Sequence, residues 1–123
     1  MNISDAEWQV IRIIWERAPV SAAEVIGRLC PANGWSHRTV RTLLARLVAK
    51  GAVRTKADGN RYLYRARVTR SRCVRAEGKS FLEKVFGGDA AELLVHFVRN
   101  ANMTPGQIDE LKRLLDEKRD EAD

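Results

Sequence analysis

The chain has 123 residues, 45% of them hydrophobic, which suffices for one folded domain or a small domain with an appended segment. Its formal net charge is +6, and residues 1–67 carry twelve Lys/Arg against five Asp/Glu, so we expect an anionic partner. Cys30 and Cys73 lack a CxxC spacing, which argues against a disulfide framework, a metal site or a bound cofactor. Without a basic leader or an apolar run of roughly 20 residues, we predict a cytoplasmic protein that does not insert into membranes.

The N-terminal half is predicted to hold three helices and a hairpin, over residues 5–17, 22–30, 37–50 and 53–66. Capping boxes at Ser4/Glu7 and Ser21/Glu24 mark the first two helix starts, and Ser36 is a plain N-cap for the third. Residues 31–34 are expected to form a turn, and residues 58–60 (Asp-Gly-Asn) the tip of the hairpin.

The C-terminal part is predicted to be helical over residues 69–86, 90–100 and 105–121, with further capping boxes at Asp89/Glu92 and Thr104/Gln107. Three short amphipathic helices bury too little surface alone, so we expect them to pair with a second copy of the chain. The apolar side chains assigned to this dimer interface are Leu82, Val85, Phe86, Leu94, Phe97, Val98, Ile108, Leu111 and Leu115.

The predicted fold class is therefore mainly α with a small β-hairpin. Three helices followed by a hairpin are the order of a winged helix-turn-helix domain, which we assign to residues 1–67. Residues 68–123 are assigned to a C-terminal helical dimerisation domain.

The third helix is the most informative element for function, because its apolar stripe leaves a basic outer face without Asp or Glu. Guanidinium groups pair with guanine edges or phosphates, while hydroxyls and small side chains permit close approach to bases. We predict DNA contacts from Ser36, His37, Arg38, Thr39, Arg41 and Thr42 in the major groove, and phosphate contacts from Arg46 and Lys50. The hairpin adds Arg54, Lys56, Asn60 and Arg61.

Two other functions are compatible with these features: a winged-helix module whose basic face docks an acidic protein, and a nonspecific DNA binder. For any single arginine in the set, a solvated surface charge is the favoured interpretation, so the DNA-binding prediction rests on the set taken together. An enzyme is disfavoured, because His37 and His96 lie in different predicted domains and neither an acidic metal cluster nor a glycine-rich phosphate loop occurs.

Several stretches, in order along nearly the whole chain, resemble the BlaI/MecI/CopY family of bacterial repressors. The matching stretches are Ser4-Asp5-Ala6-Glu7-Trp8, Trp35-Ser36-His37-Arg38-Thr39-Val40-Arg41-Thr42-Leu43, Phe81-Leu82-Glu83-Lys84-Val85-Phe86-Gly87-Gly88 and Ile108-Asp109-Glu110-Leu111. The resemblance implies a homodimeric transcriptional repressor that binds double-stranded DNA operators with TACA/TGTA-like inverted repeats. It also suggests β-lactamase and other resistance genes as targets.

In the β-lactam branch of that family, a membrane sensor metalloprotease triggers repressor cleavage within the dimerisation domain. The resemblance places the corresponding bond between His96 and Phe97, where the family more commonly has Asn-Phe. The competing interpretation makes Phe97 part of the dimer core and His96 an ordinary surface residue. The copper branch is disfavoured because residues 116–123 contain no cysteine.

Overall fold

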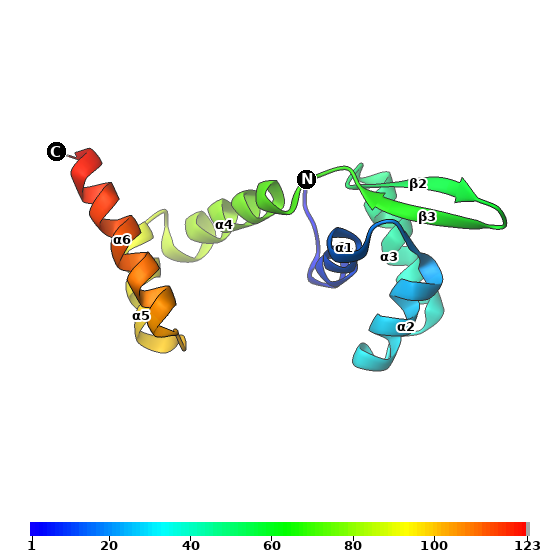
Figure 1. Ribbon diagram of the computed structural model, residues 1–123, viewed down its shortest axis with the longest axis horizontal. Coiled ribbons are helices and arrows are strands. Elements are labelled where there is room, and N and C mark those ends of the chain that lie inside the picture. The colour runs from blue at the N-terminus through cyan, green and yellow to red at the C-terminus, as the bar shows by residue number, and fades with distance from the viewer. Residues whose placement is uncertain (123) are drawn as a thin grey trace. The chain divides into compact units, whose positions relative to one another are not determined.

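A computed structural model describes residues 1–122 and contains a small antiparallel sheet among several helices (Figure 1). The elements in chain order are α1 (Asp5–Arg17), β1 (Val20–Ser21), α2 (Ala22–Asn33), α3 (His37–Ala49), β2 (Val53–Asp58), β3 (Arg61–Ala66), α4 (Arg70–Phe86), α5 (Ala90–Asn100) and α6 (Pro105–Ala122). The predicted mainly helical fold with a hairpin is confirmed.

The helix starts follow the predicted capping chemistry with one exception. Ser4 and Glu7, Ser21 and Glu24, and Thr104 and Gln107 each form the reciprocal pair of side-chain-to-backbone hydrogen bonds. At Asp89 only half of the box forms within the described residues: its carboxylate accepts the Glu92 N–H at 3.0 Å.

The prediction of a turn over residues 31–34 was wrong, because α2 continues through Pro31 to Asn33. A proline this close to the helix end removes only one late hydrogen bond. The end of α2 is held by Asn33, whose side-chain amide donates to the Leu29 carbonyl at 3.0 Å and to Gln9 Oε1 of α1 at 2.9 Å. Gly34, with φ of 67°, then ends the helix in the left-handed conformation that glycine adopts without strain.

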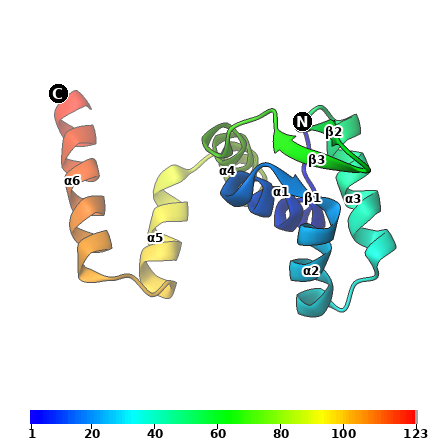
Figure 2. The same cartoon turned by 45° about the vertical axis from the view of Figure 1, so that its right-hand side comes forward.

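The sheet has the strand order β1-β3-β2 (Figure 2). The short segment between α1 and α2 contributes β1, which pairs Val20 with Tyr64. The hairpin pairs Val53 with Ala66 at its base and Asp58 with Arg61 at its tip, leaving Gly59 and Asn60 as a two-residue turn. Gly59 has φ of 61° whereas Asn60 does not have a positive φ, the pattern of a type II′ turn.

The chain divides into two compact units, Met1–Ala76 and Glu77–Asp123. The core belongs to the first unit: helices α1 to α3 bury their apolar stripes against one another and against the base of the hairpin, in a cluster that runs from Ile3 to Val53. Trp15 attaches the segment after the hairpin, because its indole N–H donates to the Val68 carbonyl at 3.0 Å. In the second unit no residue up to Ala122 is fully buried.

Candidate nucleic-acid interface

Helix α3 begins at a well-formed cap that orders its first turn. The Ser36 hydroxyl accepts the Thr39 N–H at 3.2 Å and lies 3.1 Å from the Thr39 hydroxyl. Such a cap satisfies one of the free N–H groups of the first turn and sets the angle at which the chain enters the helix. The polar residues of this turn are therefore presented on an ordered backbone.

The rotation of α3 about its axis is set by burial of one stripe. Val40, Leu43, Leu44 and Leu47 are each at most 4% exposed. Since residues three and four apart share a helix face, the remaining positions must point outward.

The outward face of α3 carries most of the predicted DNA-binding residues. Thr39 is half-buried, and the others are exposed: Ser36, His37, Arg38, Arg41, Thr42, Arg46 and Lys50. Within residues 1–122, Arg38, Arg41 and Arg46 form no ion pair. Three guanidinium groups free of acidic partners are available to phosphates or base edges.

Lys50, at the C-terminal end of α3, differs from the three arginines because it has partners inside the protein. Its ammonium group lies 2.6 Å from Glu7 Oε1 and donates to the Asn2 carbonyl at 2.6 Å. The Glu7 side chain is only 2% exposed, whereas that of Lys50 is 34% exposed. The pair therefore anchors the end of α3 to the start of α1 across 43 residues of sequence.

Glu7 combines two tasks in one carboxylate, since Oε1 also accepts the Ser4 N–H at 2.9 Å in the capping box of α1. Burial raises the pKa of Glu7, but the hydrogen bonds from Lys50 and Ser4 and the positive charge of Lys50 outweigh it and hold the pKa below its ordinary value. The other oxygen, Oε2, is buried without a hydrogen-bond partner among the described residues. Neutralising Lys50 would leave the buried Glu7 carboxylate without its cationic partner, and neutralising Glu7 would remove that buried charge.

The hairpin places the predicted wing residues Arg54, Lys56, Asn60 and Arg61 on the surface, and all four are exposed. Arg61 Nε lies 3.5 Å from Asp58 Oδ2. An ion pair as exposed as this one contributes about 0–1 kcal/mol, so it leaves the arginine free to exchange partners.

Arg65 was not among the predicted site residues, yet the structure brings it to the basic face of the hairpin. It pairs directly with Arg54 across the ladder, and opposite residues of an antiparallel pair share a face of the sheet. The signal was present in the sequence, because a two-residue turn at Gly59-Asn60 fixes this register.

The residues assigned to a dimer interface all lie in α4, α5 and α6 and are incompletely buried. Half-buried are Leu82, Phe86, Leu94 and Leu111; exposed are Val85, Phe97, Val98, Ile108 and Leu115. Between α5 and α6, which Figures 1 and 2 show as neighbouring helices, lies an open groove of about 770 Å³. Leu94, Phe97, Val98, Leu111 and Leu114 contribute its apolar lining.

His96 lies on α5, where its ring packs against two aromatic side chains and its Nδ1 lies 3.5 Å from the Asn100 side-chain nitrogen. Its ring centroid is 5.3 Å from that of Phe97 and 6.0 Å from that of Phe86. Its backbone carbonyl accepts the Asn100 side-chain amide at 2.8 Å. The peptide bond between His96 and Phe97 is therefore part of a regular helix.

Within residues 1–122, no helix combines the length and the apolar character that a membrane span needs. In the same part of the chain, no three His, Cys, Asp or Glu side chains gather where they could hold a metal ion.

A three-helix core, a small sheet with a projecting hairpin and an unpaired basic helix face define a winged-helix DNA-binding protein. The chain belongs to the penicillinase repressor family, whose model matches residues 3–117. It is 31% identical to the penicillinase repressor of Bacillus licheniformis over 94% of this chain and 91% of that one. It is 34% identical to the methicillin resistance regulatory protein MecI of Staphylococcus aureus strain N315, with 95% of each chain covered.

Solved structures agree with this assignment. The DNA-binding domain of the repressor BlaI superposes with a TM-score of 0.53 at 36% identity, covering 57% of this chain and 85% of that one. The monomeric form of B. licheniformis BlaI in complex with the blaP half-operator gives 0.52 at 35% identity, covering 58% and 87%. The predictions of a DNA-binding transcriptional repressor and of a protein that is not an enzyme are confirmed by these relatives.

The Glu7–Lys50 pair gives a prediction for stability. Glu7→Gln removes the charge that faces Lys50, so we expect the free energy of unfolding near neutral pH to fall by about 1–3 kcal/mol, less than for a fully buried pair. Because the folded-state pKa of Glu7 is lowered, its contribution is present above the unfolded pKa and is lost as pH falls through the folded pKa. Urea unfolding over a pH series should show the two proteins converging in acid.

Glu24→Gln is the matched control, because Glu24 occupies the same capping-box position in α2 and forms no ion pair within residues 1–122. Glutamine keeps the cap, so this variant should stay within about 0.5 kcal/mol of the wild type. Equal losses in the two variants would show that the cap rather than the ion pair carries the effect.

Proposed function

We propose that the protein is a homodimeric repressor that recognises inverted-repeat operators by inserting one α3 from each protomer into the major groove. The observation that carries this proposal is the outer face of α3, where Arg38, Arg41 and Arg46 are exposed and free of acidic partners within residues 1–122. The relative bound as a monomer to a half-operator supports one protomer per half-site. The names of the matched relatives favour antibiotic-resistance genes as targets. A repressor that binds bacterial operators acts in the cytoplasm, which we propose as its location.

Within α3 we assign base contacts to the N-terminal half, because that end of a recognition helix approaches the base edges. These are the roles of His37, Arg38, Thr39, Arg41 and Thr42, with the Ser36 hydroxyl committed first to the cap. Arg46, further along the helix, would contact phosphate.

The Lys50 ammonium already has two partners inside the protein, Glu7 Oε1 and the Asn2 carbonyl. A phosphate contact would add a third acceptor to the same group, and Lys donates up to three hydrogen bonds. We therefore propose that Lys50 supports α3 through Glu7 first and contributes charge to the interface second.

The wing residues are proposed to contact the DNA backbone beside each half-site. Arg54, Lys56 and Arg61 are exposed cations, and Asn60 lies in the tight turn that ends the hairpin (Figure 1). Such contacts add affinity without sequence information, so they should steepen the salt dependence of binding.

Replacing one arginine of α3 tests sequence recognition. Arg41→Ala removes a guanidinium from the proposed base-reading surface, and we expect operator affinity to fall about tenfold to a hundredfold with little change for a scrambled duplex. Fluorescence anisotropy with a TACA/TGTA inverted repeat and its scrambled counterpart, over a salt series, measures both. Arg17→Ala, which removes the same charge from an exposed position of α1, is the control.

Two other outcomes of the anisotropy titration would contradict sequence-specific operator binding. Equal, steeply salt-dependent binding of the wild type to both duplexes would indicate a nonspecific DNA binder. Absence of binding at low salt would contradict the DNA-reading function and favour an acidic protein as the partner of α3.

Dimerisation is proposed to occur through α4, α5 and α6. These helices leave Val85, Phe97, Val98 and Leu115 between 43% and 55% exposed, an unusual amount of large apolar surface for three adjacent helices. If the α5–α6 groove packed against the same groove of a second copy, these apolar side chains would be buried. A two-fold interface uses the same surface of both protomers in this way. Two linked α3 helices then bind cooperatively, because the second half-site is reached intramolecularly.

Phe97→Asp tests this interface directly. A carboxylate on the groove would have to be buried at the dimer interface, so we expect monomers in sedimentation experiments and an operator affinity reduced about a hundredfold or more. Arg99→Asp, on the same helix but outside the groove lining, should remain dimeric. A dimer that survives Phe97→Asp with unchanged operator affinity would place the interface elsewhere.

We further propose that repression is relieved by cleavage between His96 and Phe97, in response to a membrane sensor metalloprotease. That bond lies inside α5, and proteases bind extended segments, so cleavage requires local opening of the helix. The short, exposed α5 offers little resistance, because none of its residues is fully buried. Separation of the two fragments would remove Phe97, Val98 and α6 from the dimer interface.

Mass spectrometry of the repressor from cells treated with a β-lactam tests the cleavage. We expect fragments ending at His96 and beginning at Phe97 to accumulate as repression is lost. Derepression with the chain intact would contradict a proteolytic mechanism. The proposed dimer interface does not depend on this result.

A further inference from the structure

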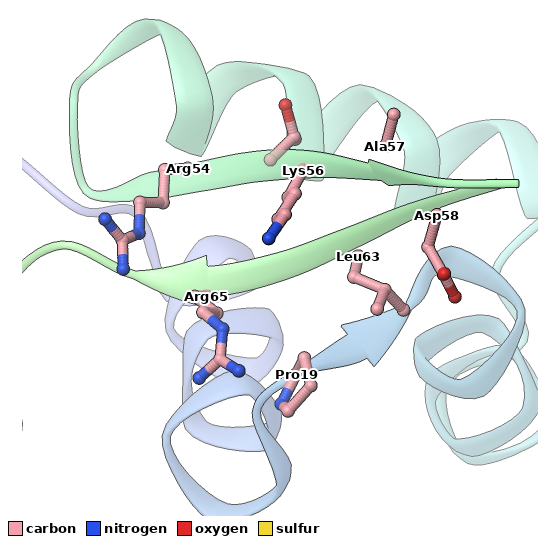
Figure 3. Close-up of a pocket in the computed structure, with 8 residues that line it drawn as sticks. Pro19, Arg54, Lys56, Ala57, Asp58, Leu63 and Arg65 are labelled. Atoms are coloured by element: carbon pink, nitrogen blue, oxygen red, sulfur yellow. The ribbon is translucent and has the colours of Figure 1, made fainter.

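The outward face of the β2–β3 hairpin contains a hollow of about 640 Å³ that the DNA-reading surface of α3 does not include (Figure 3). We name it the hairpin hollow. Its lining combines three cations, Arg54, Lys56 and Arg65, with apolar side chains, of which Pro19 and Leu63 are the largest.

The cations of the hairpin hollow lie close enough in the sheet to repel one another when no anion is bound. Arg54 and Arg65 are direct cross-strand partners, and Lys56 follows on the same face opposite Leu63. Like charges directly opposite each other in a sheet destabilise it. Asp58, the acid of the lining, lies 3.5 Å from Arg61, and no ion pair within residues 1–122 involves Arg54, Lys56 or Arg65. An anion between the two arginines would relieve this repulsion.

The apolar part of the lining favours an anion that also has an apolar part. Leu63 is half-buried and lies on β3, the strand that also carries Arg65. Pro19 comes from the segment just before β1, which pairs with β3, so both apolar side chains lie on the β1 side of Arg54 and Lys56. Figure 3 shows Pro19 and Leu63 on the same face of the hairpin as the three cationic side chains. A DNA phosphodiester would use the cations but leave this apolar surface without a partner.

We propose that the hairpin hollow binds a small organic anion with a flat apolar body, such as an aromatic carboxylate. Arg54 and Arg65 receive the carboxylate through paired N–H donors, a geometry that the guanidinium group favours. The ring covers Leu63 and Pro19, and Lys56 adds charge at the rim.

Occupation of the hairpin hollow would have a regulatory consequence, which rests on the proposed function. Arg54 and Lys56 are also proposed wing contacts to DNA phosphates, so a bound anion and the operator compete for the same charges. The ligand would therefore weaken operator binding without breaking the dimer.

Isothermal titration of the full-length, DNA-free protein tests the site itself. The probes are 2-naphthoate, its neutral amide and inorganic phosphate. We expect saturable binding of one naphthoate per chain, at least about tenfold weaker binding of the amide and of phosphate, and at least tenfold loss for the Arg54→Gln/Arg65→Gln variant. The Arg70→Gln/Arg72→Gln variant removes the same charge outside the hollow and should bind naphthoate within twofold of the wild type.

Three results would overturn the site: no saturable naphthoate binding, binding that survives Arg54→Gln/Arg65→Gln, or phosphate binding as tight as naphthoate binding. The last would reassign the hollow to simple anions such as the DNA backbone. Repeating the operator titration with saturating naphthoate tests regulation, and unchanged operator affinity would overturn that part alone. Since the first titration contains no DNA, failure of the proposed repressor function cannot be confused with failure of the site.

Discussion

Burial of one stripe of α3 is the constraint on which the other features of the N-terminal unit depend. The core contains Val40, Leu43, Leu44 and Leu47, and burial of these positions determines which residues of the helix are exposed. The Ser36 cap sets where the helix begins, and the Lys50–Glu7 pair ties its other end to α1. A basic surface on α3 is thus held by apolar packing in the middle and by polar anchors at both ends.

The two units distribute their apolar residues in opposite ways. The first unit encloses a single core built from residues between Ile3 and Val53, which is sufficient for a small domain. The second unit leaves its large apolar side chains half-buried or exposed, so its stability is coupled to whatever covers the α5–α6 groove. If a second copy is that cover, assembly and operator affinity become linked, and an event that opens α5 acts on both at once.

In the hairpin, the strand register brings charged residues that are distant in sequence onto one face of the sheet. Arg54 and Arg65 are eleven residues apart, and the two-residue turn at Gly59-Asn60 makes them neighbours on one face. That face differs from α3 in having apolar surface next to its cations. The molecule therefore carries two basic surfaces with different chemistry, one suited to base edges and phosphates and one to an amphipathic anion.

The sequence by itself determined what depends on near neighbours: the capping pairs, the hairpin turn, the helical period of α3 and hence its basic outer face. These signals act over three or four residues, so they do not require knowledge of the fold. Tertiary structure decided the rest. The Lys50–Glu7 pair joins residues 43 apart, Asn33 at the end of α2 donates to Gln9 of α1, and the hairpin hollow needs Pro19 beside Arg65. Contacts between distant segments follow from packing, which leaves no periodic mark in the sequence.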